Sequence, residues 1–463
     1  MTTTPSRISP SDQSDKSGQS HPSGHPGPLW RRPRVVLWSA AGLATAGFLI
    51  ALEIAARRYG QPGPLTVEAQ EMIFAPHSGP LLYAGLALAM VVLTWRERMI
   101  AAAAAVAIDI VFLLVRLVVG ADLNFGNGAL WVVLGLAVVA LARRTGPDRA
   151  LLLKGCGLGM LLVFGHKTGD TWLLITAKEH PQVLDPYVAL ADHALGNPSW
   201  VAGRILESIG PVGSNLLNLV YGQLPLAAAL VGLYQLRNVA TERRFPAHHL
   251  VRTFLVIGLV GPAIYMIFPV VGPVYAYGAE GGAWAVSHVW PDVLPAIGTP
   301  HPVLFDEITP RNCMPSLHTA WATSLFIHTR KGSRWMRYAG AFWLVATLSA
   351  TLGFGYHYGV DLVAGVVFAL TIEAAMRAFA RGWDLSAVRL VSYGTVIFAA
   401  LLAAYRFLPR ELAAHPWLFG PLLLLAMASV IVYFIRTTQS WDPKPTPPRL
   451  PEPRTPEPQP ELA

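Results

Sequence analysis

Long apolar runs separated by short polar segments, many of them basic, fill most of this 463-residue chain. Each run is close to the length that an α-helix needs to cross the hydrocarbon core of a bilayer, which is roughly 30 Å thick. The pattern indicates an all-α, polytopic integral membrane protein with about twelve transmembrane helices. We predict these spans at residues 35–56, 80–95, 99–120, 127–142, 149–166, 213–236, 250–272, 314–329, 338–354, 358–379, 387–406 and 415–436.

The composition agrees with a membrane protein and argues against a nucleic-acid partner. Hydrophobic residues make up 53% of the chain and charged residues only 13%. In soluble proteins about a quarter of all residues are charged. The net charge of +8 comes from Lys and Arg scattered over short loops, with no basic and aromatic stripe. The two cysteines, Cys156 and Cys313, form neither a metal-ligand spacing nor a disulfide framework.

Composition also divides the chain into five parts. Residues 1–34 are rich in Ser, Pro, His and Gly, and residues 441–463 repeat Pro with charged residues, so both read as disordered tails. Between the tails we expect an N-terminal transmembrane region with an outer loop (35–212), a core with two polar motifs (213–380) and two C-terminal helices (381–440).

The two polar motifs carry the candidate chemistry. They read Met-Pro-Ser-Leu-His at 314–318 and Tyr-His-Tyr-Gly-Val-Asp at 356–361. Ionisable groups beside long apolar runs are expensive, so they mark a functional site by default. His357 and Asp361 are four residues apart and would share one helix face. A histidine oriented by a carboxylate, together with a second histidine such as His318, is the minimum equipment for covalent phosphoryl transfer.

Loop charges predict the orientation of these motifs. If the N-terminus is inside, the inward segments hold most of the 35 Lys and Arg residues. The positive-inside rule therefore predicts a multi-pass protein of the cell (plasma or inner) membrane with both termini in the cytoplasm. His318 then begins the eighth span, while His357 and Asp361 lie at the junction of the ninth and tenth, so both motifs open on the outer face.

Pro-Ser-Leu-His at 315–318 and His-x-x-x-Asp at 357–361 resemble the second and third signature motifs of the type 2 phosphatidic acid phosphatase superfamily. Their wider wording is most similar to the inositol phosphorylceramide synthase-like branch, over roughly residues 213–380. The resemblance implies a six-helix catalytic core in which His357 attacks phosphorus to form a phosphohistidine, Asp361 orients His357, and His318 exchanges protons with the leaving and attacking oxygens. It also implies that Ser316 binds phosphate oxygens and that no metal or other cofactor is needed.

The chain departs from the family at three positions that normally carry cations. The first motif of the phosphatases, Lys-x6-Arg-Pro, is replaced by Tyr265 and Gly272 before a proline, and Thr351 stands where the third motif has an arginine. Phosphoryl transfer depends on such charges. Their loss favours a singly charged phosphodiester donor, and we expect the outward-facing Arg311 and Lys167 to be the replacement cations.

The leading hypothesis is thus a lipid phosphotransferase that moves a phosphoryl head group from a membrane lipid to a lipid or alcohol acceptor. A lipid phosphate or polyprenyl pyrophosphate phosphatase with the same catalytic residues is the alternative. A transporter is a minor alternative, because twelve spans with both termini inside fit that architecture, but the sequence lacks the related halves that transporters commonly have. The donor, the acceptor and the oligomeric state stay open at this point.

Overall fold

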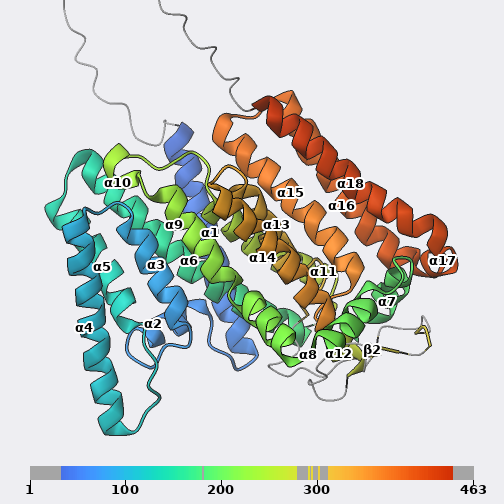
Figure 1. Ribbon diagram of the computed structural model, residues 1–463. Helices are drawn as coiled ribbons and strands as arrows, with labels where there is room; N and C mark the ends of the chain where they lie inside the picture. The colour runs from blue at the N-terminus through green and yellow to red at the C-terminus, as the bar shows by residue number, and fades with distance from the viewer. Residues whose placement is uncertain are drawn as a thin grey trace, which may run out of the picture. The chain divides into compact units, whose positions relative to one another are not determined.

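The computed structural model describes residues 33–179, 182–278, 290–291, 293–295, 301–302 and 311–441 (Figure 1). These residues are almost entirely helical, as the apolar pattern predicts, and the all-α class is confirmed. The helices are α1 (Pro33–Arg58), α2 (Pro64–Glu71), α3 (Gly79–Met90), α4 (Trp95–Val119), α5 (Asn127–Arg143), α6 (Gly146–Glu179), α7 (Asp185–His193), α8 (Pro198–Gly222), α9 (Leu224–Leu236), α10 (Val239–Glu242), α11 (Leu250–Ile267), α12 (Pro273–Tyr277), α13 (Leu317–Thr329), α14 (Arg334–Gly353), α15 (Gly359–Arg381), α16 (Leu385–Phe407), α17 (Pro409–Ala414) and α18 (Pro416–Trp441). Two short strands, β1 (Gln182–Val183) and β2 (His301–Pro302), pair antiparallel.

The chain divides into two units, Met1–Ala51 and Leu52–Ala463. In the first unit the structure describes the beginning of α1, and all other described elements belong to the second. The two tails predicted to be disordered, 1–34 and 441–463, lie outside the described residues except for the first residues of α1 and the last residue of α18.

Helices α3 to α6 form one apolar core of the second unit. Close backbone packing brings α3 against α6, since a Cβ atom at Gly159 would lie 2.3 Å from the carbonyl oxygen of Gly85. The loop before α5 is held by the buried carboxylate of Asp109 on α4, which accepts hydrogen bonds from the N–H groups of Gly126 (3.0 Å) and Gly128 (2.8 Å). Such side chains satisfy polar backbone groups that would otherwise be costly to bury.

The remaining long helices gather around α15. It packs against α13, α16 and α18, and α13 also packs against α11 and α14 (Figure 1). Within its apolar window, 72% of α15 is buried inside the protein, compared with 22% for α16 and α18. The burial makes α15 the central helix of this region, and all four residues of its first turn, 359–362, are buried.

Each of the twelve predicted spans contains a helix, but two of them differ from it by more than five residues at one end. The span predicted at 213–236 is broken, because α8 starts earlier, at Pro198, and ends at Gly222. Pro225 then lies in the first turn of α9, where a proline is tolerated. The span predicted at 149–166 continues as α6 to Glu179. The helix continues past polar residues because polar side chains can pair inside the protein, as Lys167 does with Glu71 (2.6 Å).

Six described helices are long and apolar enough to cross a membrane: α4, α6, α11, α15, α16 and α18. A seventh span results if α8 and the segment Leu224–Glu242, bent by 51°, are counted as one. The protein is therefore a multi-pass membrane protein, and the full count of about twelve spans stays a prediction.

Candidate active site

The motif at 314–318 ends a buried loop and starts α13. The hydroxyl oxygen of Ser316 caps this helix by accepting from the N–H of Thr319 (3.3 Å), and Ser316 is itself fully buried. Its backbone N–H donates to the carbonyl oxygen of Asp361 (3.3 Å), which joins the starts of α13 and α15. Gly365 permits this approach, because a Cβ atom there would lie 2.7 Å from the carbonyl oxygen of Ser316.

His357 lies in the loop between α14 and α15 and is only 4% exposed. Its Nδ1 atom is 2.7 Å from the carbonyl oxygen of Cys313 and 3.5 Å from Oδ2 of Asp361. A carbonyl oxygen only accepts hydrogen bonds, so Nδ1 carries the proton and donates it. In the neutral ring Nε2 is then unprotonated, which leaves this nitrogen with the lone pair that a nucleophile needs.

Asp361, in the first turn of α15, connects three parts of the site. Its Oδ2 atom accepts from the N–H of Tyr358 (2.7 Å) and from the thiol of Cys313 (2.7 Å), besides facing His357. The thiol also lies 3.3 Å from the carbonyl oxygen of Tyr356. Cys313 thus contacts both catalytic candidates of the third motif, through its side chain and its main chain.

Two acids of α7 support this region from outside the motifs. Asp185 accepts from the N–H groups of Val271 (3.1 Å) and Gly272 (2.9 Å) and from the hydroxyl of Tyr358 (2.9 Å). Asp192 accepts from the N–H of Val360 (3.1 Å) at the start of α15. Both carboxyl groups are fully buried, so α7 fixes the loops on which the motifs depend.

His318 lies in the first turn of α13 and is half-buried. The hydroxyl of Tyr221, at the end of α8, lies 3.0 Å from its Nδ1 atom, and the two rings stack with centroids 4.0 Å apart. When Tyr221 donates to Nδ1, the proton of the neutral imidazole is on Nε2. Tyr221 also contacts the ring of Tyr356 (5.1 Å), which connects His318 with the loop of His357.

Burial sets the protonation of two of these groups. Burial lowers the pKa of His357 to about 4, so its ring is neutral at pH 7. Burial, together with the nearby charge of Asp361, raises the pKa of Asp192 to about 8, so Asp192 is mainly protonated at the same pH. The site therefore combines a neutral imidazole with one carboxyl group, Asp192, that is uncharged near neutrality.

Two family models match separate parts of the chain. Residues 36–175 match a domain of unknown function (DUF5933), and residues 197–375 match the PAP2 superfamily. We call residues 197–375, the part of the chain that matches the PAP2 superfamily, the PAP2 domain. Searches of curated proteins and of solved structures found no match.

The PAP2 domain begins at the start of α8 and includes both motifs as well as Tyr221. Proteins of this superfamily are phosphatases or phosphotransferases, and the chain is accordingly an enzyme of that type. The resemblance to the superfamily inferred from the two motifs is confirmed at this level.

Neutral and buried groups occupy the three positions of the PAP2 domain where cations were expected. Tyr265 donates its hydroxyl proton to the carbonyl oxygen of Pro315 (3.2 Å). Gly272 adopts φ +98°, and a Cβ atom there would lie 2.4 Å from the carbonyl oxygen of Tyr356, so only glycine fits. Thr351 donates to the carbonyl oxygen of Thr347 (2.5 Å) within α14. Their hydrogen-bonding groups are used inside the protein.

The two expected replacement cations lie in different surroundings. Arg311 is fully buried two residues before Cys313, in the segment that leads to α13. Lys167 lies on α6, where its Nζ atom pairs with Glu71 (2.6 Å) and donates to Ser78 (2.9 Å). The charge of Lys167 is thus already neutralised by a residue of α2.

Sequence reasoning missed four residues of this region: Tyr221, Asp185, Asp192 and the role of Cys313. The two aspartates carried a usable signal, since they are seven residues apart in a predicted outer segment and so share one face of a helix. Tyr221 and Cys313 carried none, because only the folded chain brings them to the two histidines.

The trio Cys313, His357 and Asp361 also offers three possible metal ligands within 4.8 Å of one another. Each of the three side chains makes a short hydrogen bond within the site: the thiol donates to Asp361 and the imidazole to a carbonyl oxygen. A metal ion would have to displace both bonds. The arrangement therefore suits proton transfer and an oriented imidazole better than metal binding.

Proposed function

We propose that the protein is an integral-membrane lipid phosphotransferase that works through a phosphohistidine on His357 and is similar to inositol phosphorylceramide synthases. The observation that carries the proposal is the geometry of His357, whose Nδ1–H donates to the carbonyl oxygen of Cys313 with Asp361 3.5 Å away. These contacts hold the ring with Nε2 available for attack.

In the first step Nε2 of His357 attacks the phosphorus of the donor lipid. The bond from phosphorus to the leaving oxygen breaks as the N–P bond forms. His318, in its imidazolium form, gives its Nε2 proton to that oxygen and is left as a neutral ring whose Nδ1–H faces the hydroxyl oxygen of Tyr221. In the second step His318 takes the proton of the acceptor hydroxyl, the acceptor oxygen attacks phosphorus, and the N–P bond breaks to restore His357. Asp361 balances the positive charge of the phosphorylated ring.

The preference for a phosphodiester donor rests on charge. Tyr265, Gly272 and Thr351 offer no positive charge, and Arg311 is the cation that we assign to the phosphate. Backbone N–H groups of the first turn of α13 add a partial positive charge, as helix N-termini do. Ser316 caps this turn, so we assign it the role of shaping the phosphate site.

The site opens on the outer face of the cell (plasma or inner) membrane in our proposal, with both termini in the cytoplasm. The distribution of Lys and Arg over the loops supports this orientation.

Hydrolysis is the alternative outcome of the same chemistry. A water molecule in place of the acceptor would release phosphate, and the substrate would be a lipid phosphate or a polyprenyl pyrophosphate. The two reactions share His357, His318 and Asp361, so only the products distinguish them.

The test uses purified full-length protein and three fluorescent donors: a phosphoinositide, phosphatidic acid and a polyprenyl pyrophosphate. Each is offered with and without ceramide or diacylglycerol. A new phospholipid that forms only with an acceptor supports transfer, whereas phosphate release without an acceptor supports hydrolysis. No product from any of these donors would contradict both.

Variants test the assignments. His357→Ala and His318→Ala should each remove most activity, whereas His415→Ala, at an exposed histidine outside the site, should not. Wild-type turnover in either of the first two would overturn the mechanism. Arg311→Ala should raise KM or lower kcat, and unchanged values of both would exclude Arg311 from the phosphate site.

A further inference from the structure

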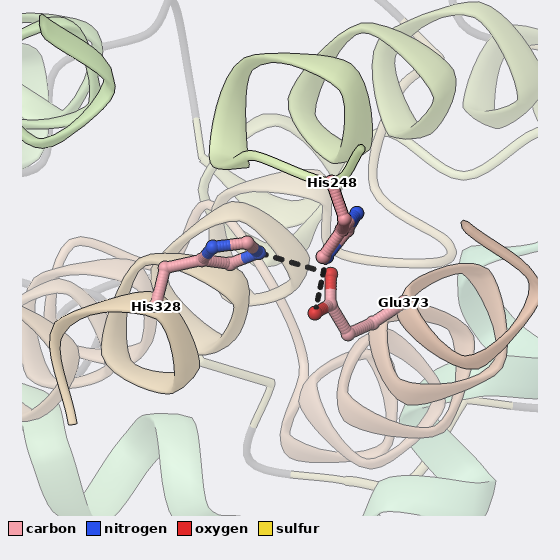
Figure 2. Close-up of side chains that lie close together, drawn as sticks. All are labelled: His248, His328 and Glu373. Carbon is pink, nitrogen blue, oxygen red and sulfur yellow. Dashed lines mark hydrogen bonds and ion pairs between the residues drawn. The ribbon is translucent and has the colours of Figure 1, made fainter. Parts of the chain in front are cut away.

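A second cluster of ionisable side chains lies at the opposite ends of α13 and α15 from the active site. Figure 2 shows His248, from the loop before α11, and His328, from the last turn of α13, converging on Glu373 of α15. The Nε2 atoms of the two histidines lie 2.9 Å and 3.2 Å from the two carboxylate oxygens. With a rise of 1.5 Å per residue, the ten residues from His318 to His328 separate the two sites by about 15 Å.

Glu373 is fully buried, and its hydrogen-bonding capacity is fully used. Besides the two histidines, it accepts from Nε of Arg377 (2.8 Å) and from the hydroxyl of Thr253 (2.8 Å). Four donors on one carboxylate account for its burial without any further ligand.

The protonation of His328 follows from its other neighbour, Gln235. The side-chain oxygen of Gln235 accepts from the N–H of Leu250 (2.8 Å), so its NH2 group faces Nδ1 of His328 (3.0 Å) and donates to it. Nδ1 is then the acceptor, and Nε2 carries the proton that points at Glu373.

The two histidines and Glu373 have the composition of a metal site, and their donor atoms lie within 4.8 Å of one another. Two features oppose metal binding. A metal on Nε2 of His328 would need a proton on Nδ1, where Gln235 already presents an N–H group. The guanidinium of Arg377 contacts the same carboxylate, and this positive charge would repel a metal ion.

The same features favour an anion. A cavity of about 370 Å³ adjoins the cluster and is lined by three cationic side chains, Lys331, Arg377 and Arg381, and by both histidines. Arg377 uses Nε on Glu373, and its terminal amino groups make no hydrogen bond within the described residues. The Nδ1 atom of His248 is buried and has no hydrogen-bond partner among them either.

We propose that this cavity binds a phosphate group, at a second site separate from the catalytic one. Arg377 and Arg381 supply planar guanidinium donors that match phosphate oxygens. Arg381 already pairs with Asp384 through Nη2 (2.7 Å), so its contribution comes from its other N–H groups. The apolar lining residues Ile327 and Trp441 fit the part of a lipid next to its head group.

The ligand is therefore a phosphate carried either by a lipid head group or by a soluble molecule. Both share the same charge and oxygen geometry, and the cavity has the size of a small-molecule site. The proposal does not depend on which reaction the catalytic site performs, because no residue is common to the two sites.

The experiment measures binding of radioactive inorganic phosphate to the full-length protein in phosphatidylcholine nanodiscs. Arg381→Gln and Arg377→Gln are compared with Arg436→Gln, a change of an exposed arginine near the end of α18 that does not line the cavity. We expect Arg381→Gln and Arg377→Gln each to raise the Kd of one class of phosphate-binding site about tenfold or more. Phosphate bound in the catalytic site stays in all variants and does not affect this comparison.

Arg381→Gln keeps every hydrogen bond to Glu373 in place, so it tests the proposal even if Arg377→Gln fails to fold. Nanodiscs that contain phosphatidic acid identify the source of the phosphate, because this lipid competes with inorganic phosphate if the cavity takes lipid head groups. Loss of inorganic phosphate binding in these nanodiscs indicates a lipid head group, and unchanged binding indicates a soluble ligand. Equal phosphate binding in wild-type protein and Arg381→Gln would overturn the proposal. The proposal would also be overturned if the purified protein contained stoichiometric zinc and His328→Asn removed that zinc.

Discussion

The charge of Asp361 should decide the rate of the phosphoryl step, and Asp361→Asn tests this directly. Asn keeps the shape of the side chain and an oxygen for the N–H of Tyr358, which lies 2.7 Å from Oδ2 in the native protein. It removes the negative charge 3.5 Å from Nδ1 of His357. At an effective dielectric constant of about 20, two unit charges at this separation attract by about 5 kcal/mol.

This attraction acts only when the ring of His357 is positively charged, as it becomes on phosphorylation. Its loss therefore raises the barrier without weakening the binding of the substrate. The amide dipole of Asn recovers part of the stabilisation, so we expect kcat to fall about 10²- to 10³-fold and KM to change little. Steady-state kinetics with the donor lipid, together with trapping of the phosphoenzyme, measures both quantities.

Asp192→Asn is the matched control. Asp192 is as deeply buried as Asp361 and contacts the same helix start, but with a pKa of about 8 it is mainly uncharged at pH 7. Its replacement by a neutral amide should change kcat less than about threefold. Equal losses in the two variants would refute the argument, because the effect would then come from packing and not from charge.

Three further predictions concern neighbouring parts of the site. Since burial lowers the pKa of His357 to about 4, protonation should abolish attack only below that pH, and kcat/KM for a phosphodiester should decline near pH 4; a midpoint near 6.5 would contradict this. Tyr221→Phe removes the hydroxyl 3.0 Å from Nδ1 of His318 but keeps the stacked ring, so kcat should fall about tenfold, and an unchanged kcat would show that the contact is not used. Gly365→Ala places a methyl group 2.7 Å from a carbonyl oxygen at the start of α13 and should destabilise the protein by about 1–3 kcal/mol in thermal unfolding, whereas Gly157→Ala, with open space around it, should not.

The helices could be predicted from the sequence because they depend on a local pattern of apolar residues. Apolar runs located a helix in each predicted span. The four-residue spacing paired His357 with Asp361, and their side chains are 3.5 Å apart. The two residues do not share a helix face, however, because α15 begins at Gly359 and His357 lies in the loop before it. The end of α6 could not be predicted in the same way, because the polar residues after 166 are typical of the end of a span. They remain helical since Lys167 finds Glu71, which is 96 residues away in the sequence.

The support of the site could not be predicted, because it depends on contacts between distant segments. Asp185 reaches Tyr358 across 173 residues, and Tyr221 reaches His318 across 97. Pairs so far apart leave no periodic pattern of residues in the sequence from which they could be predicted. The partner of His357 shows the same limit: the spacing pointed to Asp361, whereas the shortest contact of Nδ1 is a main-chain oxygen of Cys313.

The charges at the active site give the strongest reason to expect a phosphodiester donor. On the proposed assignment, Arg311 contributes one positive charge, and the N-termini of α13 and α15 contribute about half a charge each. Asp361 subtracts one, so the site offers at most about one positive charge, and Asp185 behind Tyr358 lowers this further. A phosphodiester brings a single negative charge and can be balanced, whereas a monoester dianion would leave an excess in a buried site where uncompensated charge is costly. A variant that restores a cation, Thr351→Arg, should therefore shift the preference toward monoesters, and the ratio of kcat/KM for phosphatidic acid to that for a phosphoinositide measures the shift.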